Sequence, residues 1–319
     1  MVNKIAFIFP GQGSQKTGMG KDLFDNYEIA REVFARVDVA VGKSVSKLCF
    51  EGPDEDLKLT INTQPALLAV SLAALETLKS EATKVGLTLE PSCLAGHSLG
   101  EYGALYCSGA LDLKTVMGAI SKRAELMNTA ASKTKGAMSA VLGLNAQAIS
   151  EALEGVKEGY VGVANYNDPS QTVITGEPQA IETAGEALKA AGAKRVIPLP
   201  VSGAFHSELM RDAGEQFGEF VATLDIKEAK VPVITNVDAV LTTDAQELKA
   251  KMSKQIYSSV QWVKTIEQML AQGVDTFIEI GEGKVLAGLN KKMCPETVRT
   301  FNVYDKLSLE ATLEGLKNG

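Results

Sequence analysis

Residues 93–102 constrain the fold of this chain more than any other segment. They read as a short apolar strand, a tight turn with Ser98 at its tip and the start of a helix, and they contain the pattern Gly-x-Ser-x-Gly. Gly96 and Gly100 suit a crowded turn, because a side chain at either position would collide where the strand folds back against the helix. The pattern predicts a nucleophile elbow, in which the N–H of Leu99 and the helix N-terminus favour negative charge on an oxygen bound at Ser98.

The same pattern also arises by chance, because 29 of the 319 residues are glycine. Its context favours the elbow: residues 92–95 are apolar enough for a buried strand, and residues 103–111 are small and apolar, as a buried helix requires. We therefore prefer a nucleophilic Ser98 to an ordinary glycine-rich turn.

The composition indicates a globular protein. The hydrophobic fraction is 45% and the charged fraction 22%, and 319 residues suffice for one large α/β domain or two smaller ones. A net charge of −7 without a sustained Lys/Arg stripe argues against nucleic acid as the main partner.

The first ten residues carry too short an apolar run for a signal peptide, and no stretch is long enough to span a bilayer, so we expect a cytoplasmic protein that does not bind membranes. The four cysteines lack Cys-x-x-Cys spacing and are expected to be buried thiols, not disulfides or metal ligands.

Short β-branched strands alternate with helical stretches over most of the chain. This order predicts an α/β fold in which helices cover both faces of a mainly parallel sheet, and the elbow makes that core α/β-hydrolase-like. The expected helices include residues 64–78 and 262–272. The expected strands are residues 4–9, 92–96, 231–235, 276–280 and 298–303.

The middle of the chain has a different order. Strands at residues 136–142, 160–166, 172–175 and 194–199 and helices at 146–153 and 177–191 give the order βαββαβ, with a turn at 167–170 between the central strands. This order predicts a ferredoxin-like subdomain of residues 131–198 inserted into a discontinuous core of residues 1–130 and 199–319. A crevice between the two parts is the natural place for a binding site.

The chain offers two histidines as the base for a serine nucleophile. His97 adjoins Ser98, and neighbouring side chains at a strand end point to opposite sides, so His97 is not expected to reach the hydroxyl. His206 follows a strand and precedes a predicted helix, where hydrolase-type folds place their base. The alternative is that His206 is a surface loop residue.

A second glycine-rich turn, residues 10–15, follows the first strand. The dinucleotide-binding pattern fails because Lys16 stands at its third glycine, and the Walker pattern fails because Met19 follows Gly18 where lysine is required. The turn can instead offer the backbone N–H of Gln12 as an oxyanion-hole donor.

Arg123 lies in a predicted helix over residues 114–128. A single helical arginine is usually a solvated surface residue. A role in substrate binding is indicated only if the substrate carries a carboxylate, which a guanidinium binds through two parallel hydrogen bonds.

Five segments in order resemble the malonyl-CoA:acyl carrier protein transacylase family of type II fatty acid synthesis, over nearly the whole chain. They are residues 9–15, 63–67, 96–102, 203–207 and 260–262. The resemblance implies that Ser98 is the acylated nucleophile and His206 its base. It implies that the backbone carbonyl of Gln255 orients His206 in place of a triad aspartate. Gln12 and Leu99 would supply the oxyanion N–H groups.

The resemblance also assigns residues to substrate binding. Arg123 would bind the malonyl carboxylate, and His97 and Asn165 would belong to the substrate site. The segment that carries Phe205 beside His206 resembles malonyl-selective relatives. Malonyl-CoA would acylate Ser98, and the phosphopantetheine thiol of acyl carrier protein would then take the malonyl group. No cofactor is implied, and we expect a monomer.

Docking of an acidic carrier protein on this acidic chain requires a local basic patch. Lys291 and Lys292, with Lys284 nearby, form the best cluster in the C-terminal part. The alternative is a solvated helix face without a docking role.

Three other functions fit parts of the pattern. An esterase or editing hydrolase could use the same serine, but it has no use for a buried cation in its acyl pocket. A stand-alone acyltransferase of a polyketide synthase would use identical chemistry. A catalytically inactive binding module would need neither Ser98 nor His206 nor Arg123.

Overall fold

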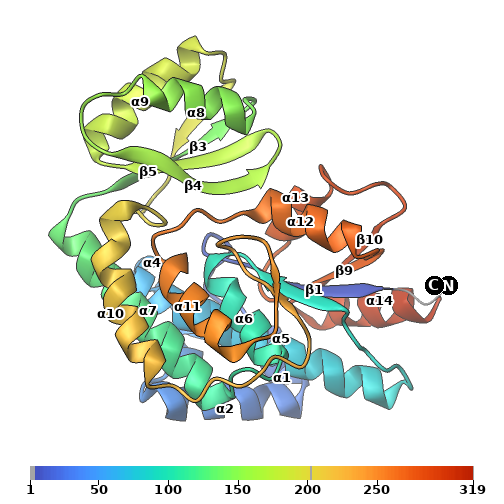
Figure 1. Cartoon of the computed structure of the whole chain (residues 1–319). Coiled ribbons are helices and arrows are strands. Elements are labelled where there is room, and N and C mark those ends of the chain that lie inside the picture. The colour runs from blue at the N-terminus through green and yellow to red at the C-terminus, as the bar shows by residue number, and fades with distance from the viewer. Residues whose placement is uncertain (1–3, 202, 319) are drawn as a thin grey trace.

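Two separate sheets organise the chain in the computed structural model, which describes residues 4–201 and 203–318 (Figure 1). The larger sheet has six strands in the order β10-β9-β1-β2-β7-β8, and the smaller sheet has four in the order β4-β5-β3-β6. The strands are β1 (Ile5–Phe9), β2 (Cys93–Gly96), β3 (Ala137–Leu142), β4 (Val161–Asp168), β5 (Gln171–Gly176), β6 (Arg195–Pro198), β7 (Val233–Ile234), β8 (Leu241–Thr242), β9 (Thr276–Ile280) and β10 (Arg299–Val303).

Helices surround the large sheet and cover one face of the small one (Figure 1). The α-helices are α1 (Lys21–Asn26), α2 (Glu28–Val41), α3 (Val45–Glu51), α4 (Asp54–Lys58), α5 (Thr60–Lys84), α6 (Glu101–Cys107), α7 (Leu113–Lys133), α8 (Ala146–Glu154), α9 (Pro178–Ala190), α10 (Arg211–Ala222), α11 (Ala245–Gln255), α12 (Trp262–Ala271), α13 (Val285–Asn290) and α14 (Lys306–Lys317). Two 3₁₀ turns are η1 (Ser98–Gly100) and η2 (Glu208–Met210).

The large sheet is parallel from β10 to β7, and the short edge strand β8 pairs antiparallel with β7. Its central strands are buried on both faces and therefore read as continuous apolar runs, such as Ile5–Phe9. The α/β class and the mainly parallel sheet, predicted from the alternation of strands and helices, are confirmed. Strand β8 was not predicted, because a strand of two residues is too short to show an alternation of apolar and polar side chains.

The carboxyl ends of β1, β2, β7 and β9 meet along one edge of the large sheet. Strand β1 has β2 on one side and β9 on the other, so the chain order reverses at β1. Ligands of open α/β sheets bind outside the carboxyl ends of the strands at such a reversal. The elbow after β2 and the glycine-rich turn after β1 both lie at this point.

Helix α5 packs at the centre of the core. It runs over Thr60–Lys84, longer at both ends than the expected residues 64–78, and most of its side chains are buried. A helix that is apolar on nearly every side belongs inside a large core, where neighbouring helices decide its length more than its own pattern. The helix after the elbow, in contrast, ends at Cys107 instead of 111, and Gly109 follows with a φ of 79°.

The small sheet is antiparallel and is built from residues 137–198. Its strand order is that of the ferredoxin-like βαββαβ unit, with α8 and α9 on one face (Figure 1). Strand β4 continues to Asp168, so the hairpin turn is shorter than the expected residues 167–170. The backbone of β4 joins the core at Val260, whose O accepts from Tyr166 N at 3.0 Å and whose N donates to Ala164 O at 2.8 Å. The division into two domains stays our interpretation.

Among the described residues, no helix is both long enough and apolar enough to cross a membrane. In the same residues, no group of three His, Cys, Asp or Glu side chains is placed to hold a metal ion. All four cysteines are free thiols. Cys49 and Cys93 are buried as expected, whereas Cys107 and Cys294 are only partly buried.

Candidate active site

Ser98 occupies a crowded and strained turn between β2 and α6. Its φ is 52°, in the left-handed region that costs a residue with a side chain on the order of 1–3 kcal/mol. A Cβ on Gly96 would lie 1.9 Å from the carbonyl carbon of Gly100, and a Cβ on Gly100 would lie 2.1 Å from the O of Phe9. The two glycines are therefore required by close backbone approach, as the elbow pattern predicted.

His206 meets Ser98 across the site, although 108 positions separate them. The distance from Ser98 Oγ to His206 Nε2 is 2.8 Å. His206 Nδ1 lies 2.9 Å from the backbone O of Gln255 and 3.1 Å from that of Ser258. Since a carbonyl only accepts, Nδ1 carries the proton and Nε2 is free to accept one from the serine. The contact with Gln255 was expected, and the second carbonyl, from Ser258, was not.

Burial keeps His206 neutral. Its side chain is 5% exposed, which excludes the surface-loop alternative. Burial, together with the charge of Arg123, lowers the pKa of His206 to about 3. The imidazole is therefore in its proton-accepting form throughout the ordinary pH range.

Arg123 projects from α7 to the serine. The side chain is 1% exposed, and burial lowers the pKa of its guanidinium, which nevertheless stays protonated. One terminal nitrogen donates to Gln64 Oε1 at 2.6 Å, and the other donates to Ser98 Oγ and Gln255 Oε1 at 3.0 Å each.

The charge of Arg123 is not matched by a carboxylate in direct contact. Within the described residues its partners are neutral oxygens, and its Nε has no hydrogen-bond partner. The ring of Tyr102 lies 5.7 Å from the guanidinium carbon. A buried cation without an ion pair is costly, and a bound anion would relieve that cost.

A small pocket of about 110 Å³ opens at Ser98. It brings together almost all the residues that the sequence singled out for the site. Its lining includes Gln12, His97, Ser98, Leu99, Arg123, Asn165, Phe205 and His206. The oxyanion role of Gln12 and Leu99 stays a prediction, as do the substrate contacts of the others.

The small sheet closes one side of this pocket. Asn165 lines it from β4, and Asn167 Oδ1 lies 2.8 Å from His97 Nε2. His97 is therefore engaged with the small sheet instead of the serine, as the geometry of a strand end predicted. Burial lowers the pKa of His97.

Four polar residues of the site were not assigned from the sequence. Gln64 accepts from Arg123, and the backbone carbonyl of Ser258 accepts from His206. Asn236 binds the backbone of the elbow, and Glu101 binds the backbone N–H of Asn236. Asn236 follows an expected strand directly, and a polar residue at a strand's carboxyl end was a usable signal.

The predicted docking lysines lie around α13. Lys292 forms an ion pair of 2.7 Å with the buried carboxylate of Asp168 at the end of β4, so it is not simply a solvated residue. Lys284 lies over the ring of Tyr304, with its Nζ 5.5 Å from the centroid. The docking role of Lys284, Lys291 and Lys292 stays a prediction.

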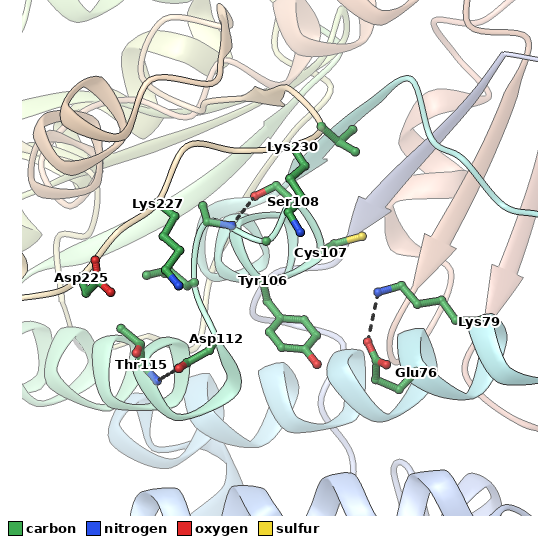
Figure 2. A pocket seen from close by; sticks show the side chains of 14 residues that line it. Glu76, Lys79, Tyr106, Cys107, Ser108, Asp112, Thr115, Asp225, Lys227 and Lys230 are labelled. Carbon is green, nitrogen blue, oxygen red and sulfur yellow. Dashed lines mark hydrogen bonds and ion pairs between the residues drawn. The ribbon is translucent and has the colours of Figure 1, made fainter.

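A larger hollow of about 670 Å³ lies elsewhere, between α5, the end of α6 and the start of α7 (Figure 2). Three lysines and three carboxylates line it, and Lys79 pairs with Glu76 at 3.1 Å. Ser108 within it is occupied by structural hydrogen bonds to Leu105 and Ala110. No histidine is among the described residues that line this hollow, so Ser108 has no histidine base beside it there.

Comparisons with known proteins agree with this geometry. A family model described as an acyl transferase domain matches residues 6–299. The chain is 46% identical over 318 residues to a malonyl CoA-acyl carrier protein transacylase of Bacillus subtilis (strain 168), covering 99% of this chain and 98% of that protein. It is similar to the solved structure of an acyl carrier protein S-malonyltransferase from Vibrio cholerae O1 biovar eltor, with a TM-score of 0.91, 42% identity, and coverage of 97% and 100% of the two chains. A malonyl-transacylase solved in complex with a type II PKS acyl-carrier protein gives a TM-score of 0.93 at 38% identity, covering 98% and 100%.

Proposed function

The chain belongs to the acyl transferase family, and from that premise we propose that it transfers the malonyl group of malonyl-CoA to the phosphopantetheine thiol of acyl carrier protein. The observation that carries this proposal is Arg123. Its buried guanidinium lies 3.0 Å from the nucleophilic oxygen and forms no ion pair with any residue that the structure describes. A malonyl thioester brings a carboxylate to it, and the guanidinium then fixes the thioester over Ser98 through two parallel hydrogen bonds.

Acylation proceeds by attack of Ser98 Oγ on the thioester carbonyl. His206 Nε2 takes the serine proton, and the N–H groups of Gln12 and Leu99 bind the oxyanion. The carbon–sulfur bond then breaks. The CoA sulfur leaves with the proton returned by His206, and the malonyl group remains on Ser98 as an ester.

Deacylation repeats these steps with the carrier thiol as nucleophile. His206 takes the thiol proton, the sulfur attacks the ester carbonyl, and the Ser98 oxygen leaves and regains a proton. Water is the competing nucleophile. Transfer then requires that the pantetheine arm of the carrier enters the pocket and excludes water from the ester.

The other features of this function are proposals of the same kind. We propose that the enzyme works in the cytoplasm as a monomer, without a cofactor, and that neither nucleic acid nor a membrane is a partner. The absence of a cofactor is supported by the chain itself, which supplies the nucleophile Ser98, the base His206 and the cation Arg123.

Intact-mass measurement after mixing with malonyl-CoA tests the function. We expect one malonyl adduct that discharges when holo-acyl carrier protein is added. The adduct should be lost in Ser98→Ala and kept in Ser108→Ala, the buried serine of the larger hollow. Release of free malonate without an adduct, in the absence of carrier protein, would instead identify a hydrolase.

A further inference from the structure

The backbone of the elbow is held by a side chain from a distant segment. Asn236 lies two residues after the end of β7, the strand beside β2 in the sheet. Its Nδ2 donates to Gly96 O at 2.7 Å, and its Oδ1 accepts from Ser98 N at 2.7 Å. One carboxamide therefore connects the two sides of the turn that carries the nucleophile.

Such a clamp is needed because the turn is strained. In the described part of the chain, the non-glycine residues with positive φ are Ser98 at 52°, His206 at 57° and Ala239 at 58°. The first two are the reacting pair, and the third lies in the loop that carries Asn236. Conformations of this kind persist only where surrounding contacts over-determine them.

Glu101 fixes Asn236 in turn. Its Oε2 accepts a hydrogen bond of 2.6 Å from the backbone N–H of Asn236. Both side chains are only 1% exposed. Glu101 is the first residue of α6, so the helix that begins below the elbow also holds the loop that clamps it.

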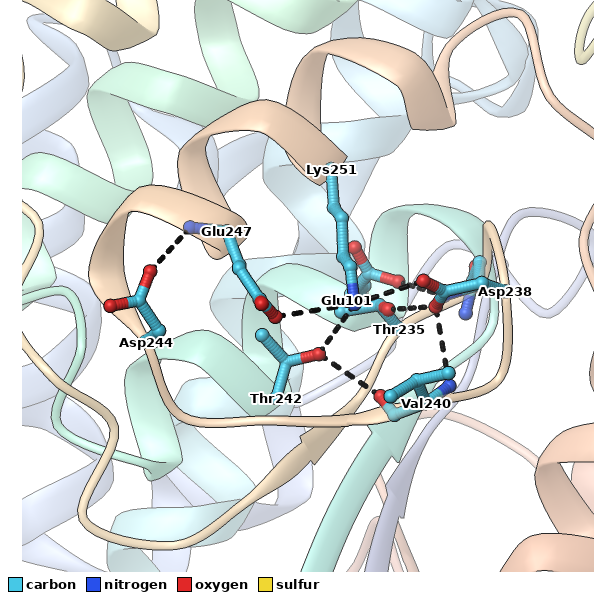
Figure 3. Close-up of polar contacts among 9 residues, drawn as sticks. Glu101, Thr235, Asp238, Val240, Thr242, Asp244, Glu247 and Lys251 are labelled. Atoms are coloured by element: carbon cyan, nitrogen blue, oxygen red, sulfur yellow. Dashed lines mark hydrogen bonds and ion pairs between the residues drawn. The ribbon is translucent and has the colours of Figure 1, made fainter.

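Further contacts anchor the same loop close to Glu101 (Figure 3). Asp238 pairs with Lys251 of α11 at 2.9 Å and accepts from Thr235 Oγ1 at 2.8 Å. The Ala239 N–H closes the loop on Thr235 O at 2.9 Å. Lys251 is thus paired with Asp238, whereas Glu101 binds the backbone of Asn236 in the same loop.

We propose that Asn236, held by Glu101, is a positioning residue for acyl transfer, which keeps Ser98 Oγ in line with His206 Nε2. This inference rests on the proposed function. It also gives a reason why Ser98 N is not a donor to the oxyanion. The N–H of Ser98 is occupied by Asn236, which leaves the neighbouring N–H of Leu99 for the substrate oxygen.

A second buried carboxylate, that of Glu279, provides a control that distinguishes a loss of positioning from a loss of stability. Glu279 on β9 is 0% exposed and accepts backbone N–H groups from Leu286 and Ala287, at 3.1 and 2.8 Å. Like Glu101 it caps a buried backbone, but that backbone belongs to α13. Glu279→Gln is therefore the control for Glu101→Gln.

The experiment measures the rate constant for Ser98 acylation by malonyl-CoA in a single turnover, below the melting temperature of each variant. We expect Asn236→Ala to lower it by about 10–100-fold with the apparent affinity for malonyl-CoA unchanged within about 2-fold. Asn236→Asp replaces the donor to Gly96 O with a second acceptor oxygen and should lose at least as much as Asn236→Ala. Glu101→Gln should lose about 5-fold, and Glu279→Gln less than about 2-fold.

Labelling of Ser98 by phenylmethanesulfonyl fluoride provides a readout that does not involve a malonyl group. We expect the same order of rates among the variants. Acylation and labelling at the parental rate in folded Asn236→Ala, or an equal loss in Glu279→Gln, would overturn the proposal. Should the parent protein react with the sulfonyl fluoride but not with malonyl-CoA, the proposed function would fail while the positioning role is still tested.

Discussion

The pocket at Ser98 and the larger hollow beside α5 differ in how their charges are balanced. The hollow is about 670 Å³ and places three lysines among three carboxylates, whereas the pocket is about 110 Å³ and holds Arg123 without an ion pair. Balanced charges in an open hollow have water and each other as partners. A buried cation that has no carboxylate in direct contact favours the binding of an anion. The active site is therefore recognised by the buried Arg123, which lacks a carboxylate in direct contact, and by the alignment of Ser98 with His206. The volume of a pocket does not identify it.

The comparison first predicts that removing the base of the pocket has a large effect. His206→Ala should lower the rate of Ser98 acylation by roughly 10³-fold, because no other described group is placed to take the serine proton. Rapid-quench measurement of the acyl-enzyme checks this. Lys230→Ala in the larger hollow is the control and should acylate at the parental rate. A loss of less than about 10-fold in His206→Ala would contradict the claim that the pocket at Ser98 holds the catalytic base.

A second prediction concerns pH. The lowered pKa of His206, about 3, means that the base stays neutral on acidification. Acylation should therefore fall by no more than about 5-fold between pH 7 and pH 5, the loss expected of Glu101→Gln, whereas a base with the ordinary pKa of about 6.5 would lose roughly 25-fold. Because Arg123 contributes to lowering this pKa, the acid limb should move to higher pH in Arg123→Ala.

The pH experiment needs a control for Glu101, because burial raises the pKa of its carboxyl group to about 7 and places its titration within the measured range. An inflection near pH 7 that disappears in Glu101→Gln belongs to Glu101. An inflection near pH 6.5 in both proteins would mean that His206 titrates as an exposed histidine, contrary to its burial.

The smallest effect is expected outside both hollows, at the predicted docking surface. Lys291→Glu should raise the apparent KM for carrier protein by a few-fold at low salt and leave that for malonyl-CoA unchanged. Lys292→Glu is a different change, because it breaks the ion pair with the buried Asp168 and should also lower thermal stability. Equal effects of Lys291→Glu on both substrates, or none, would remove this residue from the interface.

The sequence predicted the parts of the site that short segments define. The elbow at Ser98 and the turn at Gln12 depend on glycines a few positions away, and both lie where expected. The alternation of elements predicted both sheets, including the ferredoxin-like strand order.

The remaining contacts depend on pairings between distant segments. Asn236 reaches Gly96 because β7 pairs with β2, and 140 positions separate the two residues. The ion pair of Lys292 with Asp168 likewise requires the small sheet to be docked on the core. Local patterns carry no information about such contacts, which explains why Glu101, Gln64 and Ser258 were not assigned.

The most direct test of the account asks whether Arg123 reads the substrate carboxylate. The measurement is kcat/KM for malonyl-CoA and for acetyl-CoA, on the parent protein, Arg123→Ala and the control Lys230→Ala. We expect Arg123→Ala to lose at least ~10²-fold for malonyl-CoA, roughly 3 kcal/mol of transition-state stabilisation. Activity with the neutral acetyl group should fall far less or rise, and Lys230→Ala should change neither. Parallel losses for the two substrates in Arg123→Ala would contradict the account, because they would mean that the buried cation supports the fold instead of binding the malonyl carboxylate.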